Sequence, residues 1–161
     1  MKRNFILIAG IPGTGKTTFG NFLEKNYGYV HVDMEENHRT SEILTDTEVF
    51  IKEHFSGNKD IVATWGFSPD QETIDVVNKL RTFGFKIFWF DGNRDSAHKA
   101  TMNRAGFDEK VLQQQMNSLT EWNIPEKTNA KIVNVFDEKG NFRDLAEIAG
   151  ELLRGAIPTV L

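Results

Sequence analysis

The 161-residue chain contains no cysteine, which excludes a disulfide scaffold, a thiolate zinc site and a cysteine nucleophile. It also lacks any apolar run close to the roughly 20 residues that a membrane-spanning helix needs. Neither charge sign dominates, because 19 Lys and Arg stand against 23 Asp and Glu, for a net charge of −4. This balance disfavours membranes and nucleic acids as partners. We expect a soluble cytoplasmic protein.

Short apolar runs alternate with helical patterns along the whole chain, which is typical of an α/β protein with a parallel sheet. The chain has no repeat, linker or low-complexity segment, and its length suits one domain over residues 1–161. The apolar runs predict five strands with helices between them. The predicted strands cover residues 5–9, 29–32, 61–64, 85–90 and 131–136.

Polar residues and proline mark where three of the helices should begin. Residues 34–56 are expected to be helical in two pieces, with Asp46 as the N-cap of the second. Ser68 followed by Pro69 predicts a helix with serine as cap and proline in the first turn. Asn141 is expected to cap the final helix, with Phe142 on its buried side.

Residues 10–18 read GIPGTGKTT and match the phosphate-loop pattern G-x-x-x-x-G-K-[ST]. Glycines let the backbone N–H groups wrap around phosphate oxygens, and the helix that follows points its positive end at the same place. Lys16 is expected to reach the terminal phosphates, and the Thr17 hydroxyl to ligate Mg²⁺. The predicted nucleotide-binding residues are Gly13, Thr14, Gly15, Lys16, Thr17 and Thr18.

Two larger classes of phosphate-loop protein do not fit, since the chain has neither the Asn-Lys-x-Asp of GTPases nor the Leu-Ser-Gly-Gly-Gln of transport ATPases. The chain instead resembles the small P-loop kinases, the group of shikimate, gluconate and nucleoside monophosphate kinases. The resemblance covers most of the chain in layout and is specific only at the phosphate loop. It implies a three-layer fold with sheet order 2-3-1-4-5, ATP as co-substrate, and a short lid around residues 94–110.

Asp33 ends the predicted second strand, and ligands of open α/β sheets bind beyond the carboxyl ends of strands. A carboxylate there could accept the proton of an acceptor hydroxyl or hold Mg²⁺ through water. In shikimate- and gluconate-type kinases an aspartate follows the second strand in the same way. Residues 33–36 also form a capping box for the next helix, and the two roles can coexist.

The end of the third strand departs from the kinase pattern. Nucleoside monophosphate kinases often carry Asp-Gly-Phe-Pro there, but this chain has Trp65-Gly66-Phe67-Ser68-Pro69. The aspartate position is taken by tryptophan, which leaves open what replaces that carboxylate and favours the shikimate-like subset. Trp65, Gly66 and Phe67 are candidates for an acceptor-binding wall, and core packing is the alternative for the two aromatic residues.

Three arginines are candidates for contacts with anionic groups. Kinases of this group place arginines on the helix after the fourth strand and in the lid, which points to Arg94 and Arg104 as groups that neutralise charge during phosphoryl transfer. Arg39 lies in the acceptor-binding region of the group and would suit an anionic acceptor. Solvated surface arginines are the alternative for all three.

The sequence therefore predicts an ATP- and Mg²⁺-dependent kinase that phosphorylates a small molecule, with Lys16, Asp33, Arg94 and Arg104 as catalytic residues. A second interpretation is a nucleotide-binding regulatory ATPase without a small-molecule acceptor, which the missing third-strand aspartate favours. A third is a nucleic-acid end kinase, which the acidic balance disfavours. The sequence does not identify the acceptor, and it does not distinguish a monomer from a homodimer.

Overall fold

The computed structural model describes residues 3–66, 68–104 and 108–153. Five parallel strands form one sheet in the order β2-β3-β1-β4-β5, which confirms the order that the resemblance implies. The strands are β1 (Phe5–Gly10), β2 (Val30–Asp33), β3 (Ile61–Thr64), β4 (Phe85–Asp91) and β5 (Lys131–Asn134).

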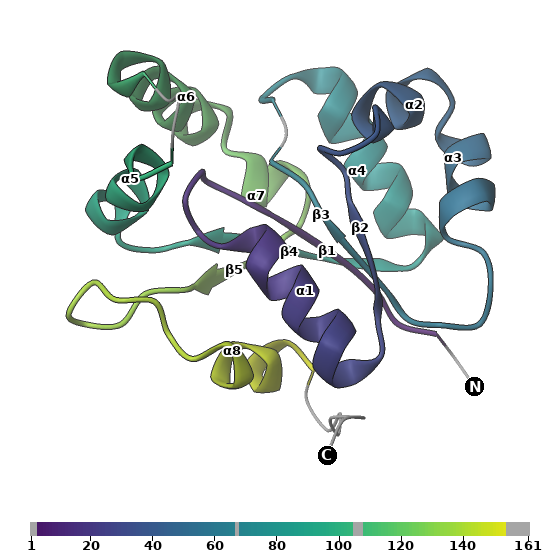
Figure 1. The fold of residues 1–161 in the computed structure, drawn as a ribbon. Helices are drawn as coiled ribbons and strands as arrows, with labels where there is room; N and C mark the ends of the chain where they lie inside the picture. Colours follow the sequence, from purple (N-terminus) through teal and green to yellow (C-terminus); the bar gives the residue numbers. More distant parts are fainter. Residues whose placement is uncertain (1–2, 67, 105–107, 154–161) are drawn as a thin grey trace.

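Helices cover both faces of this sheet, which gives three layers (Figure 1). α1 and α8 pack side by side on one face, and α4 lies on the other. None of the helices in the described ranges is long and apolar enough to cross a membrane. The helices are α1 (Lys16–Tyr27), α2 (Arg39–Thr45), α3 (Thr47–His54), α4 (Gln71–Phe83), α5 (Arg94–Met102), α6 (Glu109–Trp122), α7 (Ile124–Lys127) and α8 (Leu145–Leu152).

The core is centred on β1, whose residues 6–9 are buried on both sides of the sheet. Because helices cover both faces, a central strand has no polar side and appears in the sequence as an unbroken apolar run. Phe19 of α1 packs edge-on against Phe90 of β4, with ring centroids 5.3 Å apart. This contact fixes the start of α1, and so the phosphate loop, against the middle of the sheet.

Three predicted helix starts are wrong and one is confirmed. The capping box at residues 33–36 starts no helix, since α2 begins at Arg39 with His38 as its N-cap. Asp46 does cap α3, accepting a hydrogen bond from the backbone N–H of Val49. For α4 the cap is Asp70, two residues after Ser68, because its carboxylate accepts from the Thr73 N–H at 2.8 Å. The start of a helix carries a partial positive charge, so the Asp70 carboxylate is a better cap there than the neutral hydroxyl of Ser68.

The final helix starts three residues later than predicted. Asp144, and not Asn141, caps α8. The backbone N–H of Asn141 is used in a turn, where it donates to the Asp137 carboxylate at 3.0 Å. Phe142 therefore lies before the helix, and its side chain is 51% exposed and not part of the buried face.

Candidate active site

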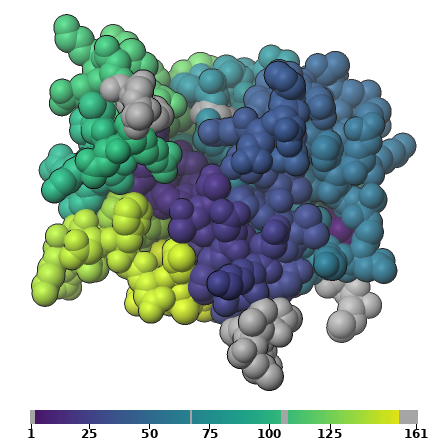
Figure 2. All heavy atoms as spheres, in the orientation of Figure 1, coloured from purple at the N-terminus to yellow at the C-terminus, as the bar shows by residue number. Residues whose placement is uncertain are grey.

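A cavity of about 310 Å³ lies beyond the carboxyl ends of β1, β2 and β3, at the edge where ligands of open α/β sheets bind. In Figure 2 the phosphate loop and α1 (purple) lie between α5 and α6 (green) on one side and the segment after β2 (blue) on the other. The cavity is lined by Gly10, Pro12, Gly13, Gly15, Lys16, Thr17, Asp33, Glu35, Thr64, Trp65, Gly66, Thr101, Arg104, Gln115 and Leu119.

The phosphate loop, residues 10–15, is a backbone cradle whose three glycines all have a positive φ. Gly13 has φ +79°, and a Cβ added to it would lie 2.0 Å from the Ala97 carbonyl oxygen. Gly15 has φ +75° and is the N-cap of α1. Thr14 closes the loop from within by donating its hydroxyl to Ile11 O at 2.9 Å. Such a cradle at a helix N-terminus fits phosphate groups.

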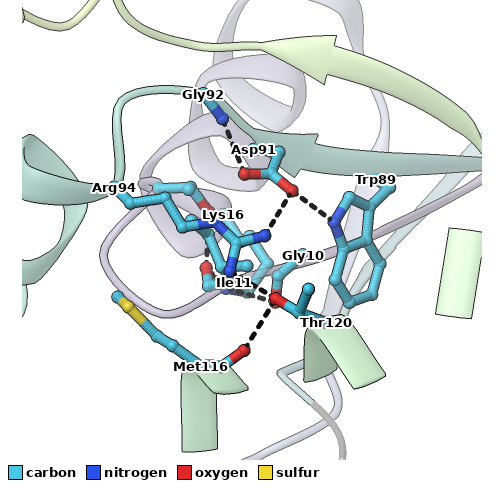
Figure 3. A network of polar contacts seen from close by, with 10 residues as sticks. Gly10, Ile11, Lys16, Trp89, Asp91, Gly92, Arg94, Met116 and Thr120 are labelled. Carbon is cyan, nitrogen blue, oxygen red and sulfur yellow. Dashed lines mark hydrogen bonds and ion pairs between the residues drawn. The ribbon is translucent and has the colours of Figure 1, made fainter. Parts of the chain in front are cut away.

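Lys16, the first residue of α1, folds its side chain back over the loop. Its ammonium group donates to Ile11 O at 2.9 Å and to Gly10 O at 3.5 Å (Figure 3). Burial of this charge lowers the pKa of Lys16 to about 8, with Arg104 acting in the same direction and the carboxylates of Glu35 and Asp33 opposing the shift. The amine is therefore held without full solvation at the place predicted for terminal phosphates.

Asp33 and Thr17 face each other across the cavity. The Thr17 hydroxyl donates to Asp33 Oδ2 at 3.2 Å, and Asp33 Oδ1 accepts from the Glu35 N–H at 3.0 Å. A hydroxyl and a carboxylate at this separation are the oxygen donors that Mg²⁺ prefers, so the residues present fit the metal. The second contact closes a backbone turn after β2, and no helix begins there, because α2 starts only at Arg39.

Arg39, a predicted acceptor contact, is turned away from the cavity. Its Nη1 donates to the backbone oxygen of Asp33 at 2.9 Å, and its nearest carboxylate is Glu36 at 4.0 Å. It is not among the lining residues. Arg39 therefore stabilises the backbone at the end of β2, where Asp33 lies.

Sequence reasoning missed Glu35 as a site residue. Its carboxylate lines the cavity and accepts a hydrogen bond of 3.0 Å from the backbone N–H of Gly66. The signal was present, since Glu35 lies two residues after Asp33 at a strand end, but the capping box accounted for it. Gly66, a predicted acceptor-wall residue, lines the cavity beside it.

Thr64, at the end of β3, is a second lining residue that was not predicted. Its hydroxyl lies 2.7 Å from Nε2 of His31, whose Nδ1 lies 2.8 Å from Asn21 Oδ1. Burial lowers the pKa of His31, which outweighs the opposing effect of Asp33 and other nearby carboxylates. A neutral imidazole in this position connects the helix after the phosphate loop to the end of β3.

The two predicted catalytic arginines differ in position. Arg104 follows α5, lines the cavity and acts on the pKa of Lys16. Arg94 does not line it. Its guanidinium donates to Thr120 Oγ1 at 2.7 Å and pairs with Asp91 at 3.2 Å (Figure 3). Arg94 therefore connects the end of β4 to α6.

The remaining residues of the predicted acceptor wall, nucleotide site and lid lie in different environments. Trp65 lines the cavity but is only 1% exposed, so most of its ring is core. Phe67 lies outside the described residues, as do residues 105–107 of the predicted lid. Thr18 is exposed on α1 and is not among the lining residues. From α6, Gln115 contributes a polar side chain to the wall.

Phe142 is an exposed aromatic residue next to the phosphate loop, and the helix prediction had assigned it to the core. A Cβ added to Gly15 would lie 3.6 Å from its Cε1 atom. Its ring packs against Phe136 with centroids 4.8 Å apart, which holds it in place while leaving it half exposed. The turn that displaced the start of α8 is what brings this ring here.

Solved structures share this architecture over nearly their whole length. A gluconokinase from Sinorhizobium meliloti 1021 matches with a TM-score of 0.59 and 18% identity over 94% of this chain and 97% of that one. A shikimate kinase from Bacteroides thetaiotaomicron gives 0.61 and 18% over 93% and 98%. The tunicamycin resistance protein of Deinococcus radiodurans gives 0.62 and 13% over 98% of both chains. The chain therefore has the P-loop kinase fold.

One curated protein adds a likeness in sequence. A segment of 79 residues, 49% of this chain, is 34% identical to the adenylate kinase of Mycoplasmopsis pulmonis (strain UAB CTIP). The match spans 34% of that protein's length. No protein-family model matches the chain. The sequence likeness, over about half of the chain, agrees with the fold.

Proposed function

We propose that this protein is an ATP- and Mg²⁺-dependent kinase that transfers the γ-phosphate to a hydroxyl group of a small molecule. The observation that carries the proposal is that Lys16, Thr17, Asp33 and Arg104 line one cavity at the carboxyl ends of the strands. These residues provide two cations for phosphate and two oxygen donors for a metal. We also propose that residues 1–161 act as one domain in the cytoplasm.

In the proposed reaction the bond between the γ-phosphorus and the oxygen that links it to the β-phosphate breaks, and the electron pair leaves with ADP. The acceptor oxygen forms the new bond to phosphorus, and its proton passes to Asp33. Lys16 and Arg104 balance the charge on the transferring group, since charge neutralisation and positioning provide most of the catalysis in such reactions. Mg²⁺, held by Thr17, would offset phosphate charge.

The position of Phe142 indicates where the base of the nucleotide binds. An aromatic ring that is 51% exposed beside the N-cap glycine of α1 offers a flat surface for a base whose phosphates occupy the loop. Stacking of a base on an aromatic side chain contributes about 1–3 kcal/mol and tolerates different bases. We therefore assign the base to the face of Phe142, which leaves the ends of β2 and β3 for the acceptor.

The test is transfer of label from γ-labelled ATP, with Mg²⁺, to a panel of hydroxyl acceptors. Label on an acceptor that Lys16→Ala abolishes supports the kinase. Lys25→Ala is the matched control, because Lys25 is an exposed lysine at the other end of the same helix. Label found only as free phosphate, whatever acceptor is added, contradicts the proposal and favours the regulatory ATPase.

A further inference from the structure

The charges that line the cavity are not evenly distributed. The cations among its described lining residues are Lys16, on the phosphate loop, and Arg104, after α5. The carboxylates are Asp33 and Glu35, at and just after the end of β2. The two carboxylates therefore lie at the end assigned to the acceptor, where Glu35 is also the carboxylate that acts most strongly on the Lys16 ammonium.

Glu35 is fixed at this acceptor end by a specific contact. Its Oε1 accepts from the Gly66 N–H at 3.0 Å, and a Cβ on Gly66 would lie 2.5 Å from the same oxygen. The carboxylate thus occupies the space left by a glycine at the end of β3. Its second oxygen accepts no hydrogen bond from any described residue, so it is available to a ligand.

Apart from Lys16 and Arg104, no cation of the described residues lines the cavity beside these carboxylates. Arg39 is the nearest candidate in sequence, and its guanidinium donates to the backbone oxygen of Asp33. The residues of the predicted acceptor wall and lid that lie outside the description are uncharged by sequence, namely Phe67 and residues 105–107 (Ala-Gly-Phe). Lys16 and Arg104 are engaged once phosphate occupies the loop.

We infer that the acceptor is a neutral or amine-bearing polyhydroxy compound, and not a carboxylic acid or a monophosphate. This inference rests on the proposed kinase function. A carboxylate accepts hydrogen bonds from hydroxyl and ammonium groups, so Glu35 would hold either kind of donor. An anionic acceptor would instead face two like charges without a guanidinium to pair with. Each such repulsion weakens binding by about tenfold in a partly exposed site.

The experiment compares acceptors in matched pairs that differ in charge: gluconate with sorbitol, glucuronate with glucosamine, and adenosine monophosphate with adenosine. Each is presented to the full chain with γ-labelled ATP and Mg²⁺, and kcat/KM is measured for both members. The expected result is label on the neutral or amine-bearing member of a pair, with kcat/KM at least about tenfold above that of its acidic partner. A pair in which the acid is the better substrate overturns the inference and leaves the kinase intact.

Two variants assign the selectivity to one side chain. Glu35→Gln keeps the acceptor for the Gly66 N–H and removes the charge, so it is expected to improve the acidic member of the pair by about tenfold relative to the neutral one. Glu36→Gln removes the same charge one residue away and outside the cavity lining, and should leave the ratio unchanged. Equal effects of the two variants overturn the assignment to Glu35. Absence of label on every acceptor overturns the kinase and this inference together.

Discussion

The Glu35 carboxylate accepts a hydrogen bond of 3.0 Å from the backbone N–H of Gly66, across the ends of two neighbouring strands. The sequence comparison with nucleoside monophosphate kinases left open which carboxylate stands in for an aspartate at the position of Trp65. Glu35 brings a carboxylate to the same edge of the sheet from the segment after β2. In this chain a carboxylate therefore lies at the end of β3 although that strand itself supplies none.

Gly66→Ala should lower the transfer rate through Glu35. The new Cβ would lie 2.5 Å from Glu35 Oε1, and only a side-chain tip has to move, so the free energy of unfolding should change by less than about 1 kcal/mol. The displaced carboxylate should reduce kcat/KM by about tenfold. The same substitution in a Glu35→Ala background should have little further effect. Additive losses in the double variant would contradict the proposed link.

Gly13→Ala should destabilise the protein more than Gly57→Ala does. Both glycines have a positive φ, +79° and +99°, so both variants carry a strain of about 1 kcal/mol. Gly57 has open space around its Cβ position, whereas that of Gly13 lies 2.0 Å from the Ala97 backbone oxygen. Overpacking of this kind adds about 1–3 kcal/mol. Urea unfolding measures the difference, and equal losses would show that the loop can move away from α5.

Arg104→Ala should mainly reduce activity, whereas Arg94→Ala should mainly reduce stability. Arg104 lines the cavity and its guanidinium has no hydrogen-bond partner among the described residues, so its loss should reduce kcat at least about a hundredfold with unchanged stability. Arg94 binds Asp91 and Thr120, so its loss should cost about 1 kcal/mol of stability and have a smaller effect on kcat. The reverse pattern would return Arg94 to the catalytic role that the sequence predicted.

Phe142→Ala should weaken nucleotide binding, and Phe142→Tyr should preserve it. The ring is 51% exposed, so truncation costs little packing, but it removes the proposed stacking surface. Loss of about 1–3 kcal/mol of stacking corresponds to about a 5- to 150-fold higher Kd for ADP and for GDP alike. Calorimetric titration with both nucleotides checks this. Unchanged affinity in the alanine variant would place the base elsewhere.

The fold and the phosphate loop could be predicted because both depend on short, continuous segments of the sequence. The buried strand at residues 5–9 is a continuous apolar run, and the loop motif has a fixed spacing set by backbone contacts to phosphate. Asp33 was predictable for the same reason, since it follows a strand directly. These features depend on few residues outside their own segment.

The acceptor side could not be predicted because it depends on contacts between distant residues. Arg39 was expected to meet an anionic ligand, but a backbone oxygen six residues upstream accepts its hydrogen bond. Glu35 and Phe142 had ordinary local explanations, a capping box and a helix face. The Gly66 N–H brings Glu35 into the cavity lining, and the turn before α8 brings Phe142 beside the phosphate loop. Both contacts join residues that are far apart in the sequence, so local patterns do not reveal them.

Lys16→Met should make the ligand-free protein more stable at pH 7, and this gain should disappear as the pH rises. The pKa of Lys16 is about 8 in the folded protein against 10.5 for an ordinary lysine. Between these values the unfolded chain binds more protons than the folded one, so the free energy of unfolding of the unmodified protein rises with pH. Below pH 8 the amine is charged in both states, and the folded state carries the whole cost of its burial.

Methionine keeps the apolar stem and removes the charge, so the variant should gain at most about 3 kcal/mol at pH 7. Urea unfolding at pH 7, 8, 9 and 10 should show the two proteins converging toward pH 10.5. Lys25→Met, at the exposed end of the same helix, should show no such trend. A constant difference at every pH would mean that the Lys16 charge is not destabilised by burial. Convergence would mean that the chain tolerates an unfavourable buried cation in the phosphate loop, which is expected when bound phosphate offsets that cost.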